Sequence, residues 1–238
     1  MAEPRLGIVL SCEHASWTTP PGVDLRVSEH ALKSQAGWDH GAYEIAARLG
    51  EELGLPVHCG AFTRMFVDLN RGPSHPDVIP AVSYGEPVPG NVGLSDAQRA
   101  ARLAEYHAPY WRAVLHDVQA RLTDGGRCLH LSSHSFDPSL DAQARAFDVG
   151  VLYDPSSPLE SQLAEALMFG LRGAGLSVRA NQPYSGTAPA LVTSLRGQLQ
   201  TERYAGIEIE ASHAVTYRAG GCAEIARGLL AAIAALRD

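Results

Sequence analysis

Lysine is nearly absent from this sequence, which contains a single one, Lys33. Lysine and arginine together number 19 against 26 acidic residues, so the formal charge of the 238-residue chain is −7, and no cluster of basic residues occurs along it. A protein that binds nucleic acid needs a basic face to neutralise phosphates. The composition therefore argues against nucleic acid as a partner.

Closely spaced cysteines and long apolar runs are also missing. The four cysteines are scattered without CxxC spacing, which argues against a disulfide framework and against a thiolate zinc site. No apolar run reaches the length of about 20 residues that a membrane-spanning helix needs. Residues 1–5 lead directly into an apolar strand pattern, so we expect no signal peptide. These features predict a cytoplasmic protein without a membrane partner.

The periodicity of the sequence predicts an α/β fold. Residues 6–12 form a continuous apolar run typical of a strand that is buried on both faces. A helical pattern at 42–53 and a strand pattern at 57–61 follow, and this order predicts a crossover in a largely parallel sheet. We expect further strands at 65–69, 128–132, 149–153, 177–180 and 205–211, and helices at 28–34, 95–122, 159–171 and 222–236.

The size and hydrophobic content of the chain suit one domain that spans residues 1–238. With 45% hydrophobic residues the chain can bury a substantial core. We expect a single three-layer domain with a mixed, largely parallel central sheet flanked by helices. Residues 72–93 carry five prolines and four glycines without periodicity, which predicts a long irregular loop. Loops of this length usually cover a binding site.

Two arginines stand in the otherwise apolar stretch 62–71. Burying Arg64 and Arg71 costs desolvation unless they meet partners or an anionic ligand. The guanidinium fork matches a carboxylate in bidentate fashion, so the pair suggests a clamp for an acidic small molecule. A strand end with solvated charges and an ion pair between Asp68 and Arg71 is the alternative.

Polar side chains follow several of the predicted strands. Glu13 and His14 follow the first strand, His134 follows the strand that begins near Cys128, and Asp39 lies at a helix start. Parallel strands bring their carboxyl ends to one edge of the sheet, where ligands bind. Two imidazoles and a carboxylate, with one position left for water, are the ligand set of a catalytic zinc site. We therefore predict one zinc ion bound by His14, Asp39 and His134, with Glu13 and His40 as alternative ligands.

Glu208 and Glu210 lie two residues apart in the last predicted strand, so their side chains point to the same face. A carboxylate beside an activated water can act as general base and then as general acid. Glu210 is nearer the end of the strand and is the predicted catalytic residue, with Glu208 as the alternative. Either glutamate can instead pair with an arginine of the clamp.

A series of motifs occurs in order over residues 7–215, and together they resemble the N-formylglutamate amidohydrolase family. This family is related in fold to zinc carboxypeptidases and aspartoacylases, that is, to the phosphorylase/hydrolase-like folds. The motifs are Ser11-Cys12-Glu13-His14-Ala15, Trp38-Asp39-His40-Gly41-Ala42, Thr63-Arg64, Val67-Asp68-Leu69-Asn70-Arg71, Pro89-Gly90-Asn91, Ser133-His134-Ser135-Phe136, Gly150-Val151-Leu152-Tyr153-Asp154, Asn181-Gln182-Pro183-Tyr184-Ser185-Gly186 and Ile207-Glu208-Ile209-Glu210.

The resemblance implies a zinc-dependent hydrolysis of a short N-acyl group, nominally formyl, from an acidic amino acid. His14 and His134 match the metal-binding histidines, and Glu210 matches the catalytic carboxylate. Asn70 and Arg71 resemble the pair that holds the substrate carboxylate, and Arg64 resembles the arginine that polarises the scissile carbonyl. Asn181 and Tyr184 are expected to line the pocket.

One position departs from the pattern of the wider fold group. Trp17 stands where that group has a glutamate ligand, so the carboxylate ligand has to come from elsewhere, and Asp39 is inferred. Two other readings stay open: a carboxypeptidase-like metallohydrolase acting on another N-acyl or peptide substrate, and a non-catalytic binder of acidic small molecules. The partner in each case is a small molecule.

Overall fold

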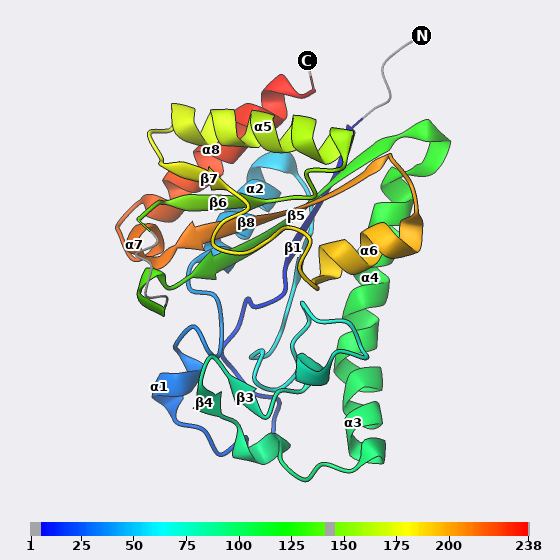
Figure 1. Cartoon of the computed structure of the whole chain (residues 1–238), viewed down its shortest axis with the longest axis vertical. Coiled ribbons are helices and arrows are strands. Elements are labelled where there is room, and N and C mark those ends of the chain that lie inside the picture. The colour runs from blue at the N-terminus through cyan, green and yellow to red at the C-terminus, as the bar shows by residue number, and fades with distance from the viewer. Residues whose placement is uncertain (1–5, 141–145, 238) are drawn as a thin grey trace.

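The central sheet of the protein has six strands in the order β2-β1-β5-β8-β6-β7 (Figure 1). It is seen in a computed structural model that describes residues 6–140 and 146–237. Neighbouring strands are parallel except for β6 and β8, which are antiparallel, so the expected mixed, largely parallel sheet is confirmed. The strands are β1 (Leu6–Cys12), β2 (Val57–Cys59), β5 (Arg127–Phe136), β6 (Val149–Leu152), β7 (Val178–Ala180) and β8 (Tyr204–Ser212).

Helices cover both faces of the sheet. Successive residues of a strand point to opposite faces, so the apolar strands place apolar side chains on both faces, and the helices bury them. Ile8 and Leu10 of β1 pack in a core cluster with residues of α2 (Ala42–Leu53), α5 (Pro158–Gly173) and α8 (Gly221–Ala235). Val9 points the other way and packs with residues of α4 (Ala108–Arg121) and α6 (Leu191–Leu199). These two clusters make the three layers that the sequence predicts.

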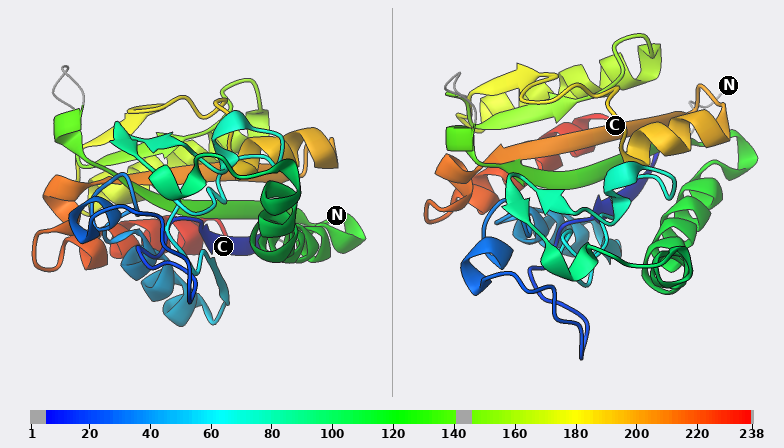
Figure 2. Two further views of the ribbon diagram at one scale, coloured as in Figure 1. Left: turned by 90° about the horizontal axis from the view of Figure 1, so that it is seen from below. Right: turned by 60° about the horizontal axis from the view of Figure 1, so that its bottom comes forward.

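A further part of the chain lies beyond the sheet and has its own core. Residues between 23 and 110, among them Leu25, Met65 and Val88, form a separate apolar cluster. This part lies at the bottom of Figure 1 and is seen from below in Figure 2. Its short elements are α1 (Glu29–Leu32), β3 (Val82–Ser83), β4 (Glu86–Pro87), α3 (Asp96–Arg102) and the 3-10 turns Pro76–Val78 and Pro89–Asn91.

The strand expected at 65–69 is wrong, because this segment is a series of turns. Its carbonyl groups are satisfied by side chains rather than by a neighbouring strand: the Asn91 amide donates to Met65 O, and Trp111 Nε1 donates to Leu69 O. Residues 72–93 are largely irregular, as expected, apart from two 3-10 turns and the small β3–β4 hairpin.

Three other elements differ from the expectation. The helix expected at 95–122 begins at the Ser95 cap but is divided into α3 and α4 by a π-helical turn at Leu103–His107. Helix α6 was not expected, and β5 continues past Ser132 to Phe136. The remaining short elements are α7 (His213–Thr216) and the 3-10 turns Thr123–Gly125 and Pro138–Leu140. In the described ranges no helix combines the length and the apolar character that crossing a membrane requires.

Candidate active site

The register of the central strands brings the candidate residues to one edge of the sheet. His134 of β5 lies opposite Glu210 of β8, and Ser132 lies opposite Glu208. These four side chains share one face because they are two residues apart along each strand. His14 follows the end of β1, which pairs with β5. The edge therefore gathers two histidines and two glutamates from three adjacent strands.

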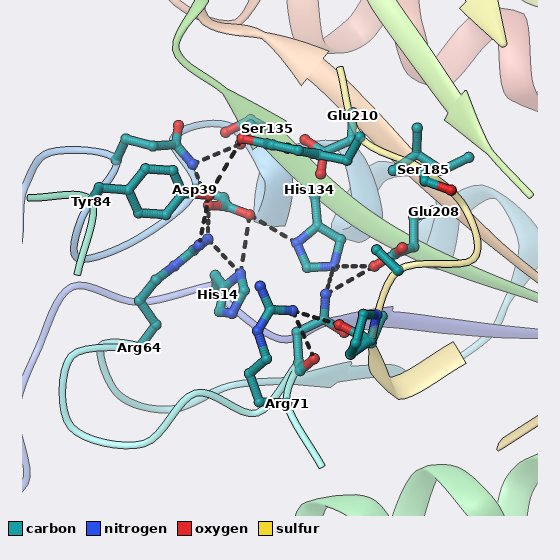
Figure 3. A pocket seen from close by; sticks show the side chains of 17 residues that line it. His14, Asp39, Arg64, Arg71, Tyr84, His134, Ser135, Ser185, Glu208 and Glu210 are labelled. Atoms are coloured by element: carbon teal, nitrogen blue, oxygen red, sulfur yellow. Dashed lines mark hydrogen bonds and ion pairs between the residues drawn. The ribbon is translucent and has the colours of Figure 1, made fainter. Parts of the chain in front are cut away.

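His14, Asp39 and His134 form a buried cluster whose ligand atoms all lie within 4.8 Å of one another (Figure 3). Asp39 Oδ2 lies 3.2 Å from His14 Nδ1 and 2.8 Å from His134 Nδ1. Asp39 N donates to His14 O, which fixes the loop before α2 against the end of β1. A tetrahedral zinc ion with bonds near 2.0 Å separates its ligand atoms by about 3.3 Å. The three residues predicted as metal ligands are thus brought together with spacing that suits such an ion.

A buried carboxylate supports the far nitrogen of each histidine. Asp68 Oδ1 lies 2.8 Å from His14 Nε2, and Glu13 Oε2 lies 3.0 Å from His134 Nε2. When Nε2 carries the proton and donates it to a carboxylate, Nδ1 keeps its lone pair for a cation. Glu13, an alternative ligand in the sequence analysis, therefore lies behind His134 rather than within the three-residue cluster.

Burial opposes ionisation of Asp68 and Glu13, yet their partners overcome it. The pKa of Asp68 is held below its usual range by His14 and the nearby guanidinium groups. The pKa of Glu13 is lowered by His134 and by the Ser132 hydroxyl, and Tyr110 donates a further hydrogen bond of 2.8 Å to Oε1. Both groups are therefore anions that can stabilise the histidines behind a cation.

Arg64 extends from the turn segment into the centre of the site. Its Nη2 contacts both His14 Nδ1 and Asp39 Oδ1, and Nη1 lies 3.4 Å from the Tyr84 hydroxyl. Burial disfavours ionisation of Asp39, but the charge of Arg64 holds the pKa of Asp39 well below its usual range. The guanidinium thus shares ligand groups with the predicted metal position.

Glu210 is buried and its Oε2 has no hydrogen-bond partner among the described residues. Burial raises the pKa of Glu210 to about 8, and the charges of Asp39 and Glu208 add to this effect. A buried carboxyl with an unpartnered oxygen and a pKa near neutrality can both accept and return a proton. These are the properties required of the predicted catalytic residue.

Glu208 has a different environment. The Asn70 amide donates to Glu208 Oε1 at 2.8 Å, and Asn70 Oδ1 accepts a hydrogen bond from Leu191 N. Asn70 is therefore held between β8 and the start of α6, and it reaches the pocket with its amide already bonded. Glu208 makes no ion pair with an arginine in residues 6–140 and 146–237, contrary to the alternative weighed for the sequence.

The residues predicted to bind substrate fall into two groups. Arg71 lines the pocket and is steadied by a hydrogen bond of 2.7 Å from Nη1 to Pro189 O, and Tyr184 also lines it. Asn181 does not line the pocket; its Oδ1 accepts from Tyr153 N and Gly186 N and so shapes the loop that carries Tyr184. His40 bonds to Thr216 and lies outside the lining as well.

The pocket has a volume of about 110 Å³, and its lining includes two tyrosines, Tyr84 and Tyr184, whose hydroxyl oxygens are 3.3 Å apart. Sequence reasoning did not anticipate Gln35, whose amide donates to Asp39 Oδ1 and Ser135 O. It also missed Asp68 as the partner of His14. The lining comprises His14, Gln35, Asp39, Arg64, Asn70, Arg71, Tyr84, His134, Ser135, Leu152, Tyr184, Ser185, Ala188, Pro189, Ala190, Glu208 and Glu210.

The donor set and its charge fit a divalent cation. Around the cluster lie the carboxyl groups of Asp39, Asp68, Glu13, Glu208 and Glu210, against the guanidinium groups of Arg64 and Arg71. Burial disfavours the charged form of His134, but Asp39 and Glu13 raise its pKa well above the usual range. The centre keeps an excess of negative charge even when His134 is charged and Glu210 is protonated. Buried negative charge of this kind is stabilised by a bound metal ion.

The α/β fold and the polar pocket at the carboxyl edge of its strands are consistent with a hydrolase, and the comparison with known families names the class. The sequence matches the N-formylglutamate amidohydrolase family over residues 6–216. The chain belongs to this family, and family membership implies a hydrolase that acts on an amide bond of a small molecule.

Solved structures share the fold of this chain. A gene product of Agrobacterium tumefaciens shares 29% identity with a TM-score of 0.83, over 100% of this chain and 93% of that one. An N-formylglutamate amidohydrolase from Ralstonia eutropha shares 19% identity with a TM-score of 0.67, over 98% of this chain and 95% of that one, and at this identity the likeness concerns the fold. No curated protein matches the chain.

Proposed function

We propose that this chain is a zinc-dependent amidohydrolase that removes a short N-acyl group from an acidic amino acid, as in N-formyl-L-glutamate. The observation that carries the proposal is the convergence of His14, Asp39 and His134 beside the buried, unpartnered carboxyl of Glu210. The family match supports the amide bond as the point of attack. A cytoplasmic location stays a prediction from the cysteine pattern.

His14 Nδ1, an Asp39 oxygen and His134 Nδ1 would hold the ion. A bound divalent ion of this kind lowers the pKa of water to about 7 and polarises a carbonyl. Glu210 takes the proton of the attacking water on its free Oε2 and returns it to the leaving amine nitrogen. Because its carboxyl is buried, this exchange occurs near neutral pH.

Arg64 and Arg71 divide the recognition of the substrate. Arg64 donates hydrogen bonds to the carbonyl oxygen of the acyl group as negative charge develops there. Arg71, at the pocket wall next to Pro189, binds a carboxylate of the amino acid through its guanidinium fork. The small volume of the pocket, whose lining includes Tyr84 and Tyr184, favours a short acyl group over a peptide.

Elemental analysis followed by a hydrolysis screen tests the proposal. We expect about one zinc ion per chain and release of formate from N-formyl-L-glutamate, lost with a chelator and restored by zinc. His134→Asn should abolish metal binding, whereas the exposed matched control His30→Asn should retain it.

Other outcomes of the screen favour the alternative readings. Faster cleavage of dipeptides with an acidic carboxyl-terminal residue identifies a carboxypeptidase-like enzyme. A protein that binds N-acyl glutamate but carries no metal and gains no activity with added zinc is a non-catalytic binder. A preference for N-formyl-L-leucine over N-formyl-L-glutamate contradicts the role given to Arg71.

A further inference from the structure

The outer surface of α5 and α8 carries an apolar groove of about 480 Å³. These helices pack side by side at the top of Figure 1, away from the lower part of the molecule. Their backbones approach closely: a Cβ atom added to Gly170 would lie 2.3 Å from Gly228 O. The floor of the groove is therefore made of glycines and alanines, and it stays open because these side chains are too small to fill it.

Phe169 lines this groove at its surface, with 80% of its own surface exposed. The Phe169 side chain and the groove form one contiguous apolar patch, and such patches often mark contact sites between proteins. Phe169 and the groove lie on the same surface of the helices, so this one patch contains both a protruding apolar side chain and an apolar groove. A two-fold interface requires such a self-complementary patch.

Two charges flank Phe169 on the same face of α5. Glu165 lies four residues before it and Arg172 three residues after it, about 6 Å and 4.5 Å along the helix axis. Both side chains are exposed, and within the described ranges neither makes an ion pair. The patch is thus negative on one side of Phe169 and positive on the other.

We propose that the face formed by α5 and α8 is the contact between two copies of this chain, related by a two-fold axis near Phe169. An antiparallel pair of α5 helices brings Glu165 of each protomer to Arg172 of the partner subunit. The same symmetry inserts each Phe169 into the groove of the other protomer. The pocket at the carboxyl edge of the strands stays open, since its lining includes no residue of α5 or α8.

Sedimentation velocity and light scattering on the full chain, over a range of protein concentrations, test the proposal. We expect a dimer that Phe169→Asp weakens by about 30-fold or more, the effect of losing a central anchor. The control Val92→Asp changes another exposed apolar residue, 65% exposed, far along the chain and should leave the dimer intact. Circular dichroism checks that both variants are folded.

A charge exchange shows whether the helices meet in the antiparallel arrangement. Glu165→Arg and Arg172→Glu alone should each weaken the dimer several-fold, because each places like charges opposite one another. The double variant should recover most of the association. A protein that stays monomeric at every concentration, a dimer unaffected by Phe169→Asp, or a double variant as weak as the single variants overturns the proposal.

Discussion

Glu210 lies directly opposite His134 across the ladder between β5 and β8. The proposed proton acceptor and a candidate metal ligand are therefore held by the centre of the sheet rather than by loops, and their relative position does not depend on loop closure. Groups that act on one reacting atom need this kind of fixed placement.

The substitution Glu210→Gln keeps the shape of the side chain but removes its ability to accept a proton. We expect kcat to fall by about 100- to 10,000-fold, the usual contribution of a general base, with metal content unchanged. The exposed Glu51→Gln on α2 is the matched control. Turnover of Glu210→Gln close to that of the parent assigns the proton transfer to another group.

Arg64→Met separates substrate activation from metal binding. Loss of a donor to the developing oxyanion should reduce kcat by about 100-fold or more. Since Arg64 contacts His14 Nδ1 and Asp39, its removal should leave zinc affinity equal to or above that of the parent. Isothermal titration of the metal-free protein measures this affinity, with Arg48→Met on α2 as control. A few-fold change in turnover removes Arg64 from the mechanism.

Asp68→Asn and Glu13→Gln weaken the support behind the two histidines. Each should lower zinc affinity by about 10- to 100-fold, the usual effect of losing a carboxylate that orients a histidine ligand. Competition with a chromophoric chelator gives the affinity, and Glu105→Gln on the exposed side of the π-helical turn is the control. Unchanged affinity in both variants shows that the ion is not held through His14 and His134.

We expect buried His130 to make the free energy of unfolding depend on pH. Burial lowers the pKa of His130 to about 4, and its ring nitrogens lie within hydrogen-bond distance of Ser11 and Tyr204. The unfolded imidazole, with an ordinary pKa near 6.5, gains a proton first as the pH falls. The contribution of His130 to the free energy of unfolding is therefore complete above pH 6.5 and is lost towards pH 4, by about 3 kcal/mol.

Urea denaturation at several pH values between 4 and 7 measures this effect. His130→Gln should show a shallower loss of unfolding free energy with falling pH than the parent, whatever its absolute stability. The exposed His116→Gln on α4 should keep the parent slope. Equal slopes for His130→Gln and the parent contradict the assignment.

Patterns of side-chain burial explain which parts of the fold could be predicted. The strands β1 and β6 are largely apolar runs, and β8 alternates apolar residues with Glu208 and Glu210; the positions of all three were predicted within a residue or two. The end of β5 was missed because His134 and its serine neighbours are polar, yet they are buried against the site and α2. Helix α6 was missed because its cap is Ala190, with Thr193 bonding back to it, rather than a Ser or Asp.

The candidate ligands could be anticipated because strand ends and chemistry point to the same residues. His14, Asp39 and His134 were chosen from the sequence, and the structure brings them together. Asp68 was considered only as a partner of Arg71, in the alternative to the arginine clamp, and its contact with His14 was not anticipated. Sequence spacing does not reveal this contact, because the segment 65–69 folds back as turns and its direction depends on long-range bonds from Asn91 and Trp111.

The position of Arg64 bears on how a divalent metal ion would bind to the protein. Its guanidinium contacts His14 and Asp39, two of the three residues that would hold the ion, so it offsets part of the negative charge at the centre. A divalent ion held by these residues would compete with Arg64 for Asp39 and His14. Under the proposed mechanism Arg64 is also the donor to the acyl carbonyl, so the presence of the ion would set where this donor lies.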